Sequence, residues 1–377
     1  MQQIIQRFTI SYEFPVCFTR ATFAADNLVL RNLVARAGNS KHKVLPVIDQ
    51  QVLESHPSII SQLEVYAHTH SDLIELILPP LSVRSGEVCK TDPIEVDAFY
   101  RITQERNIDR HSFVLVIGGG SVIDAMGYAA ATAHRGIRLI RMPTTVLGQN
   151  DAGVGVKNAV NYLGRKNYLG TFVPPFAVIN DFDFLRSLPA RDQRAGMAEA
   201  VKVSLIKDRD FFNWLYEHRF ALAAFEDDAV EYMIRRCAEL HLHHIASSGD
   251  PFEYGSARPL DYGHWSAHRL EELSHSDLRH GEAVAIGVTL DSLYSQAQQL
   301  IDASLVQKII TTFKDIGFSL YHPSLKQLNV SKALQDFREH LGGELCITLL
   351  TGEGVSAQFN HIDDNVMLSC IAKMAEL

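Results

Sequence analysis

The sequence has 377 residues, of which 46% are hydrophobic, and its formal net charge at pH 7 is -9. This length predicts two domains with sizeable cores, and the acidic balance disfavours a nucleic-acid-binding protein. No apolar run approaches the roughly 20 residues of a membrane-spanning helix, and the N-terminus lacks the pattern of a signal peptide. The five scattered cysteines contain no C-x-x-C pair, which indicates reduced thiols and a cytoplasmic protein.

Short apolar runs alternate with helical patterns over the first 180 residues. The runs at 44–49, 113–119, 137–145 and 177–181 are typical of buried parallel strands. The segments 50–66 and 94–108 have helical periodicity. This alternation predicts a Rossmann-like, doubly wound α/β domain over residues 1–181.

The pattern becomes mainly helical after residue 190. Helices are predicted in five segments: 192–218, 226–247, 264–275, 281–300 and 303–316. We therefore expect a second, mainly α-helical domain over residues 182–377, with the boundary near Pro189.

A glycine-rich turn follows the strand at 113–117. Gly118, Gly119 and Gly120 allow a phosphate to approach the backbone, and the next helix directs free N–H groups and its positive end toward an anion. Ser121 is a candidate N-cap for this helix, and Asp124 in its first turn suits the helix dipole. The alternative is a tight strand–helix turn that needs glycine only for its backbone conformation. The turn is not a G-x-G-x-x-G fingerprint.

The stretch 151-DAGVGVKNAVNYLGRKNYLG-170 combines glycines with cationic and amide side chains. Lys157, Lys166 and Asn167, together with the neighbouring Arg165, Asn158 and Asn161, suit a phosphate and several sugar hydroxyls. The alternative is a solvated surface hairpin, but we favour a ligand-binding role.

One glutamate and a group of histidines predict a metal site. Glu199 and Lys202 share a helix face, which in most proteins gives a plain surface ion pair. His264 and His268 also share a face, and His280 precedes Gly281 and Glu282. One Glu and two or three His are typical of catalytic zinc. Spacing leaves open whether His268 is a ligand. We expect ordinary roles for His241, His243, His244 and His275.

These segments together resemble the sugar phosphate cyclase superfamily, which includes 3-dehydroquinate synthase. The resemblance spans about residues 49–354. It rests on motifs in one order: 86-GEVCKTD-92, 118-GGGSVID-124, 143-PTT-145, 151–170, 196-GMAEAVK-202, 261-DYGHWSAH-268 and 280-HGEAV-284.

The resemblance implies specific roles for individual residues. It implies that Glu199, His264 and His280 bind Zn²⁺ or Co²⁺, and that His268 lies beside the substrate. It implies NAD binding at Gly118–Ser121, with Asp49, Glu87 and Lys90 near the adenosine and Thr144 and Thr145 near the nicotinamide. Substrate and catalytic positions match Asp151, Lys157, Lys166, Asn167 and Lys202. Arg135 matches an arginine that reaches the phosphate in the neighbouring subunit, which implies a homodimer.

The chemistry implied by the resemblance is a phosphate-eliminating cyclisation. NAD⁺ transiently oxidises a hydroxyl of a sugar phosphate, phosphate leaves by elimination, and the hydride returns. Ring opening and an internal aldol step then give a carbocycle, as in cyclitol biosynthesis. The enzyme class is therefore a carbon–oxygen lyase.

The substrate is inferred from positions at which these motifs differ from those of 3-dehydroquinate synthase. 3-Dehydroquinate synthase has Asn where this chain has Asp261, and its arginine lies four residues before that position, whereas Arg258 lies three before. The helix at 229–248 has histidines where that enzyme has a lysine for the substrate carboxylate, and 338-REHLGGEL-345 lacks its lysine pair. D-Y-G-H resembles 2-epi-5-epi-valiolone synthases, although these usually lack the counterpart of His268. We favour sedoheptulose 7-phosphate, a neutral heptulose phosphate, as the substrate.

Two enzyme alternatives and one non-catalytic alternative remain open. The chain could be a 3-dehydroquinate synthase, or a metal-dependent polyol dehydrogenase that accumulates NADH. A non-catalytic NAD-binding relative is disfavoured, because the glutamate, both matched histidines and the matched lysines are all present.

Overall fold

The computed structural model describes residues 3–248, 252, 258–275, 277–340 and 343–377. The chain forms two compact units. The first comprises residues 1–143 and 156–181, and the second comprises residues 144–155 and 182–377.

A parallel sheet of seven strands forms the centre of the first unit. Its strands are β1 (Val16–Thr19), β2 (His42–Asp49), β3 (Ile74–Leu76), β4 (Leu81–Val83), β5 (Phe113–Gly118), β6 (Arg138–Pro143) and β9 (Ala177–Asp181). The order is β1-β9-β6-β5-β2-β3, and β4 also pairs with β2. All pairs are parallel. The four strands expected from sequence are confirmed as β2, β5, β6 and β9, and the doubly wound α/β class is confirmed.

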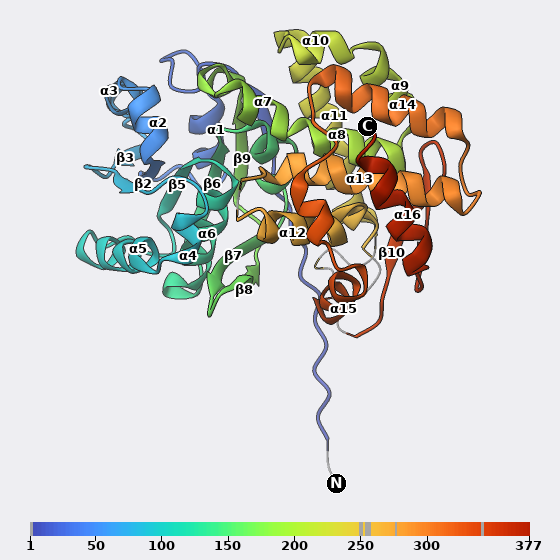
Figure 1. The fold of residues 1–377 in the computed structure, drawn as a ribbon. Coiled ribbons are helices and arrows are strands. Elements are labelled where there is room, and N and C mark those ends of the chain that lie inside the picture. The colour runs from blue at the N-terminus through green and yellow to red at the C-terminus, as the bar shows by residue number, and fades with distance from the viewer. Residues whose placement is uncertain (1–2, 249–251, 253–257, 276, 341–342) are drawn as a thin grey trace. The chain divides into compact units, whose positions relative to one another are not determined.

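Helices cover both faces of this sheet (Figure 1). They are α1 (Val29–Ala35), α2 (Gln50–Ser55), α3 (Ile59–Thr69), α4 (Val88–Thr91), α5 (Ile94–Glu105) and α6 (Gly120–Thr132). On one face, α5 and α6 pack Phe99, Val122 and Met126 against Leu45 and Val116. The helix expected at 94–108 is confirmed. The single helix expected at 50–66 is wrong: Pro57 follows His56, whose backbone leaves the helical region, and the chain forms two helices instead.

The strand order reverses between β2 and β5. Consequently Asp49 and Gly118, which end these strands, lie side by side at the carboxyl edge of the sheet. A Cβ added to Gly118 would lie 3.0 Å from the Cβ of Asp49. Such a switch point is where open α/β sheets bind ligands.

The lysine-rich stretch forms an antiparallel hairpin of β7 (Lys157–Tyr162) and β8 (Arg165–Phe172). Leu163 and Gly164 both have positive φ angles, as a two-residue hairpin turn of type I′ requires. The backbone therefore has the hairpin that the sequence analysis gave as the alternative. Two of its amide side chains, Asn161 and Asn167, bind neighbouring elements, as described below.

The second unit is mainly helical, as expected. Its helices are α7 (Ala190–Ala195), α8 (Met197–Lys207), α9 (Arg209–Glu217), α10 (Arg219–Ala223), α11 (Asp227–Ser247), α12 (His264–Leu273), α13 (His280–Ala297), α14 (Ala303–Ile316), α15 (Val330–His340) and α16 (Asp364–Met374). The segment 192–218 is not one helix. It breaks at Gly196 and at Asp208, whose side chain caps α9 by accepting a hydrogen bond from the Phe211 backbone N–H. The hairpin of β10 (Ile347–Gly352) and β11 (Val355–Phe359) was not expected.

Helix α13 is the buried centre of the second unit. Residues from Ala283 to Ser295 are buried along its whole circumference, and it packs against α8, α12, α14 and α16. Within the described residues, no helix combines the length and the hydropathy needed to span a membrane.

Candidate active site

The predicted metal ligands meet inside the second unit. Glu199 lies on α8, His264 is the first residue of α12, and His280 is the first residue of α13. His264 Nε2 is 3.5 Å and His280 Nε2 is 3.4 Å from Glu199 Oε1. All three candidate ligand atoms lie within 4.8 Å of one another.

This geometry fits a tetrahedral cation. Two ligands that are each about 2.1 Å from a tetrahedral ion lie about 3.4 Å apart, which matches the separations of His264 and His280 from Glu199. Neither carboxylate oxygen of Glu199 has a hydrogen bond of ordinary geometry, although both are buried. Two imidazoles and one carboxylate are a donor set typical of zinc, with one position left for substrate oxygen.

The turn before α12 directs His264 toward Glu199. Gly263 has a φ of 77°, and a Cβ there would lie 2.6 Å from the backbone N of Val288. Only glycine fits this close contact with α13. His264 Nδ1 lies 3.1 Å from the carbonyl oxygen of Tyr262. This bond favours the tautomer that presents the Nε2 lone pair to Glu199.

The buried carboxylate of Asp291 binds the residues before and after His264. Asp291 of α13 accepts hydrogen bonds from the Gly263 backbone N–H at 3.0 Å and from Trp265 Nε1–H at 2.9 Å. Burial outweighs these bonds and raises the pKa of Asp291 to about 7. Sequence reasoning missed Asp291, which lies inside an apolar helix 27 positions after His264.

Each residue of the H-G-E motif has a different role at the start of α13. His280 faces Glu199, whereas Gly281 touches α7 so closely that a Cβ would lie 1.6 Å from the Ala195 carbonyl oxygen. Glu282 accepts from the Arg279 backbone N–H and pairs with Arg191 of α7 at 2.6 Å.

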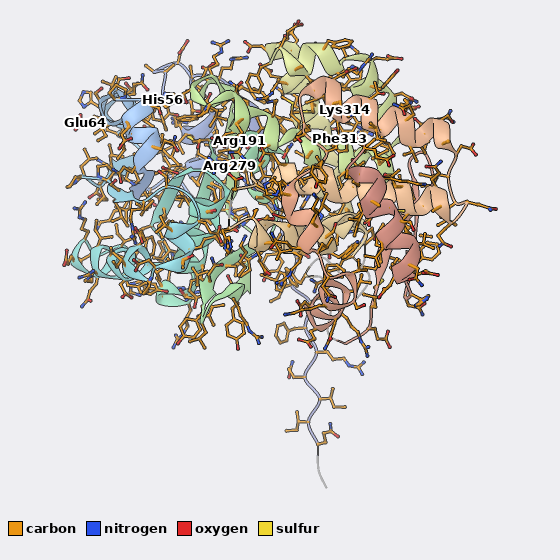
Figure 2. The ribbon with its side chains drawn as sticks, in the orientation of Figure 1. His56, Glu64, Arg191, Arg279, Phe313 and Lys314 are labelled. Atoms are coloured by element: carbon orange, nitrogen blue, oxygen red, sulfur yellow. The ribbon has the colours of Figure 1, made fainter. Side chains whose placement is uncertain are left out.

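A second ion pair connects the same two elements. Arg279 donates to Asp192 of α7 at 3.0 Å, so each element supplies one arginine to a carboxylate of the other. Figure 2 labels the two arginines, Arg191 and Arg279. These contacts fix the start of α13 and hence the position of His280.

Glu271 orients His280. Its Oε1 lies 2.7 Å from His280 Nδ1. Burial alone lowers the pKa of His280, but Glu199 and Glu271 raise it to about 10. The site therefore attracts a cation, either a proton or a metal ion. Sequence reasoning missed Glu271, although its spacing of three from His268 on one helix was a signal.

His268 is exposed at the edge of this cluster. Its ring centroid is 5.4 Å from that of His264 and 6.1 Å from that of His280. One nitrogen also groups with Glu271 and His280 within 4.8 Å. His268 therefore adjoins the two predicted histidine ligands.

Glu199 and Lys202 form a buried ion pair within the cluster, not the surface pair that their spacing usually gives. Burial opposes ionisation of Glu199, but Lys202 and the two histidines hold the pKa of its carboxyl well below the usual value. Burial also opposes charge on Lys202, but Glu199 and Asp151 outweigh it, so the pKa of Lys202 is raised. Asp261 acts on Lys202 in the same direction.

Asp151 binds a histidine for which we expected an ordinary role. It lies in a π-helical turn, η2 (Gly148–Ala152), against α11, and its Oδ1 is 2.7 Å from His241 Nδ1. Burial opposes ionisation of Asp151, but His241 and Lys202 lower its pKa. The signal for His241 was its spacing from Ile234 and Cys237, which share the buried face of α11.

In the first unit, the glycine turn leads directly into α6. Gly119 is the N-cap and α6 begins at Gly120, so the expectation that Ser121 is the N-cap is wrong. Ser121 lies within the first turn, and its hydroxyl donates to Glu87 Oε2 at 3.1 Å. The start of this helix lies beside Asp49 at the switch point, and its free N–H groups are suited to bind an anion.

Lys90 connects the glycine turn to the hairpin. Its buried ammonium pairs with Asp124 of α6 at 2.8 Å and donates to Asn167 Oδ1. On the same hairpin, Asn161 donates to Glu87 Oε1 at 2.7 Å. Four of the residues implied by the resemblance are therefore brought together here: Glu87, Lys90, Ser121 and Asn167. Asp124 joins them, but the expectation that it lies in the first turn of α6 is wrong, because the helix begins at Gly120.

The remaining predicted residues occupy several positions. Lys157 and Lys166 are exposed on β7 and β8, and Thr144 and Thr145 follow β6. Asp261 is the last residue of a short helical turn, η4 (Pro259–Asp261), before α12, and Arg258 precedes this turn. Arg135 is exposed beyond the C-terminus of α6. Of the stretch 338–345, residues 341–342 lie outside the described residues.

Comparison with known proteins identifies the family. Residues 80–195 match the family model of the 3-dehydroquinate synthase N-terminal domain, and residues 196–339 match that of the C-terminal domain. 3-Dehydroquinate synthase of Shewanella sp. (strain MR-4) is 33% identical over 329 residues, which cover 87% of this chain and 89% of that protein. This chain belongs to the 3-dehydroquinate synthase family.

Solved structures extend this relationship to the sugar phosphate cyclase superfamily. 2-epi-5-epi-Valiolone synthase from Streptomyces hygroscopicus subsp. jinggangensis 5008, with NAD⁺ and Zn²⁺ bound, is 26% identical. Its TM-score is 0.86, with 100% of this chain and 99% of that chain covered. 2-Deoxy-scyllo-inosose synthase, complexed with carbaglucose-6-phosphate, NAD⁺ and Co²⁺, is 21% identical with a TM-score of 0.75, covering 96% of each chain. The chain is therefore an enzyme of this superfamily.

The fold also extends to dehydrogenases. Glycerol dehydrogenase from Schizosaccharomyces pombe is 14% identical with a TM-score of 0.63, covering 98% of this chain and 91% of that chain. At this identity the similarity concerns the fold alone.

Proposed function

We propose that this enzyme is an NAD- and metal-dependent cyclase that converts sedoheptulose 7-phosphate to a carbocycle and releases phosphate. The observation that carries the proposal is the Glu199–His264–His280 set, in which Glu199 and His264 are buried and His280 is half-buried, beside the Lys202 ammonium. A catalytic metal set alone fits many reactions, but in this family it adjoins a lysine that can stabilise developing negative charge.

Separate groups of residues would hold the metal ion and the cofactor. When bound, NAD⁺ supplies a transient hydride acceptor and the metal ion polarises a substrate oxygen. Glu199, His264 and His280 would hold the metal, and the glycine turn before α6 would hold the cofactor pyrophosphate. Because NAD is regenerated in each turnover, the reaction is a carbon–oxygen lyase reaction without net redox change.

The chain's own side chains would bind and orient the substrate. Lys157 and Lys166 are exposed cations on the hairpin and suit the phosphate. Lys202 would hold its proton at Nζ and stabilise the oxyanion that develops at the reacting carbon, since its raised pKa keeps it charged. Holding one substrate through several steps is an effect of orientation.

The choice of a neutral heptulose phosphate rests on Asp261, on His241 and on the similarity to 2-epi-5-epi-valiolone synthase. Asp261 places a carboxylate near Lys202, and an added carboxylate disfavours an acidic substrate. A second candidate is 3-dehydroquinate synthase, because the curated relative at 33% identity has that name.

The test measures phosphate release and NADH absorbance together, with NAD⁺ and Zn²⁺ or Co²⁺ present. Sedoheptulose 7-phosphate and the seven-carbon keto-acid phosphate of 3-dehydroquinate synthase are run in parallel. We expect phosphate from the first substrate without accumulation of NADH.

The other results contradict the proposal in different ways. Phosphate from the keto-acid alone would identify a 3-dehydroquinate synthase. Accumulation of NADH from glycerol or another polyol, without phosphate release from either sugar phosphate, would indicate a dehydrogenase instead.

A further inference from the structure

The β7–β8 hairpin is irregular where it carries Lys166 and Asn167. The register of its ladder shifts between Val160 and Tyr162 of β7, so that Asn161 stands opposite residues 166–168 of β8. An excess of residues on one strand is a β-bulge, which bends that strand and redirects its side chains. Within the bulge, Asn167 has a φ of 52°, a left-handed conformation that asparagine adopts more readily than most residues.

The side chain of Asn161 closes this bulge. Its Oδ1 accepts a hydrogen bond from the backbone N–H of Asn167 at 2.9 Å. Its Nδ2 donates to Glu87 Oε1 at 2.7 Å and to Thr91 Oγ1 at 3.0 Å. A carboxylate only accepts and a backbone N–H only donates, so this orientation of the amide satisfies both sides.

These bonds join the bulge to α4 in a closed ring. Glu87 is the N-cap of α4 and Thr91 is its last residue, so Asn161 binds both ends of this short helix. The buried Lys90 of α4 donates in turn to the side chain of Asn167. Asn167 is therefore held at its backbone by Asn161 and at its side chain by α4.

The ring also reaches the glycine turn. The second carboxylate oxygen of Glu87, Oε2, accepts a hydrogen bond from the Ser121 hydroxyl at 3.1 Å. Ser121 lies in the first turn of α6, directly after Gly120. One glutamate thus connects the turn suited to the cofactor pyrophosphate with the hairpin suited to the substrate.

Burial contributes little to holding the bulge. Residues 165–170 of β8 are all exposed, so directional hydrogen bonds are left to fix its geometry. A long exposed side chain such as Lys166 loses conformational freedom when it binds a ligand. A backbone that is already fixed reduces this cost, and the affinity for the ligand rises.

We propose that Asn161 is a positioning residue, which fixes the bulge that presents Lys166 and Asn167 to the phosphorylated substrate and joins it through Glu87 to the glycine turn. The inference rests on the proposed function, which supplies that substrate. The alternative is that Asn161 contributes only to the stability of the hairpin.

Reversing one hydrogen bond tests the proposal. In the double variant Asn161→Asp with Glu87→Gln, the new amide at position 87 can donate to the new carboxylate at position 161, and its oxygen can still accept from Ser121. The Asn167 N–H also keeps an acceptor. Asn161→Asp alone places two carboxylates together, and Asn161→Ala removes both sides of the ring. Tyr168→Phe is the matched control, because Tyr168 is exposed on the same hairpin.

In Asn161→Ala we expect KM for the sugar phosphate to rise about tenfold while kcat changes less than about threefold, because the bulge binds the ground state and the transition state alike. Asn161→Asp should bind at least as weakly, and the double variant should return to within about threefold of the wild type. The contacts are exposed, so unfolding temperatures should stay within about 2 °C. A wild-type KM in Asn161→Ala, or a double variant no better than Asn161→Asp, would overturn the inference.

Hydrogen exchange reports on the bulge without turnover. With NAD⁺ bound, we expect the peptide of residues 163–170 to exchange faster in Asn161→Ala than in the wild type or in Tyr168→Phe. Unchanged exchange in Asn161→Ala would reject the positioning role.

Calorimetric titration distinguishes failure of the inference from failure of the proposed reaction. The probes are sedoheptulose 7-phosphate and, separately, the keto-acid phosphate, added to zinc- and NAD⁺-loaded protein. Binding of either probe that weakens in Asn161→Ala, without phosphate release by the wild type, would support the positioning role and reject the reaction. Phosphate release that is unaffected by Asn161→Ala would support the reaction and reject the role. Absence of both binding and release would reject both.

Discussion

The carboxylate of Glu199 is both the partner of a buried ion pair and a candidate metal ligand. It pairs with Lys202 and faces two imidazoles while both of its oxygens are buried. Removing one partner of a buried ion pair leaves the other charge uncompensated, which costs about 3–5 kcal/mol. The same substitution also removes the only anionic group among the three candidate metal ligands.

The substitution Glu199→Gln tests the ion pair and the metal-ligand role together. We expect less than about 0.1 metal ion per chain after dialysis, and a free energy of unfolding lowered by about 3 kcal/mol when measured with a chelator. Elemental analysis and urea unfolding provide the measurements. Glu64→Gln is the matched control, because Glu64 is exposed on α3 (Figure 2). Full metal content in Glu199→Gln would rule out the predicted ligand set.

Asp291 predicts a pH dependence of stability. Its pKa is raised from the usual value near 3.8 to about 7 in the folded protein, so the folded state binds more protons than the unfolded state between these values. Its contribution to stability is therefore fully present below about pH 4 and is lost as the pH rises through 7.

The substitution Asp291→Asn should abolish this pH-dependent part of the free energy of unfolding. Between pH 5 and pH 7 we expect the unfolding free energy of the wild type to fall by about 2 kcal/mol relative to the variant. Urea unfolding at several pH values measures the difference. Parallel pH profiles would show that Asp291 is ionised throughout this range.

At the scale of elements, close approach of helices positions the ligands. His264 and His280 are the first residues of α12 and α13, so the start of each helix sets the place of its histidine. These helix starts are fixed by Asp291, by the crossed arginine pairs and by glycines that allow backbone contact.

Gly281→Ala tests this positioning. A Cβ 1.6 Å from the Ala195 carbonyl oxygen forces α13 away from α7, and overpacking of this kind costs about 1–3 kcal/mol or more. We expect a lower melting temperature and weaker binding of Zn²⁺, measured by competition with a chelating dye. Gly352→Ala is the control, because its Cβ would meet Val355 at an ordinary 3.7 Å. Equal zinc affinity in both variants would mean that the start of α13 does not set the site.

At the scale of the whole molecule, Arg135 argues for an active site shared between subunits. It follows α6, a helix of 13 residues, and therefore lies about 20 Å from the glycine turn at the other end of that helix. An arginine there cannot contact a ligand at the N-terminus of its own α6. The resemblance assigns it to the phosphate in a neighbouring subunit, so we predict a homodimer.

Mixing two inactive variants tests the shared site. Arg135→Ala and Glu199→Gln should each lose phosphate release. Mixed dimers contain one site with both native residues, so a 1:1 mixture should recover up to about a quarter of wild-type activity after subunit exchange. A mixture that stays inactive, although mass spectrometry shows mixed dimers, would place Arg135 outside the partner's site.

Local patterns in the sequence predicted the main parallel strands and the long helices, but they missed the β10–β11 hairpin. Apolar runs predicted β2, β5, β6 and β9, and periodicity predicted α11, α13 and α14, because burial of one face or stripe leaves a repeat in the chain. The errors arose where one residue overrides a pattern, as Pro57 does between α2 and α3.

By itself the sequence determined the fold class, the family and the identity of the candidate ligands, because strand and helix periods and ordered motifs are properties of the chain. Only the tertiary structure decided that Glu199 and Lys202 are buried, that Glu271 and Asp291 fix the two histidines, and that His241 belongs with Asp151. The physical reason is that burial and pairing depend on which helices pack together, and residues 90 positions apart leave no local signal of their contact.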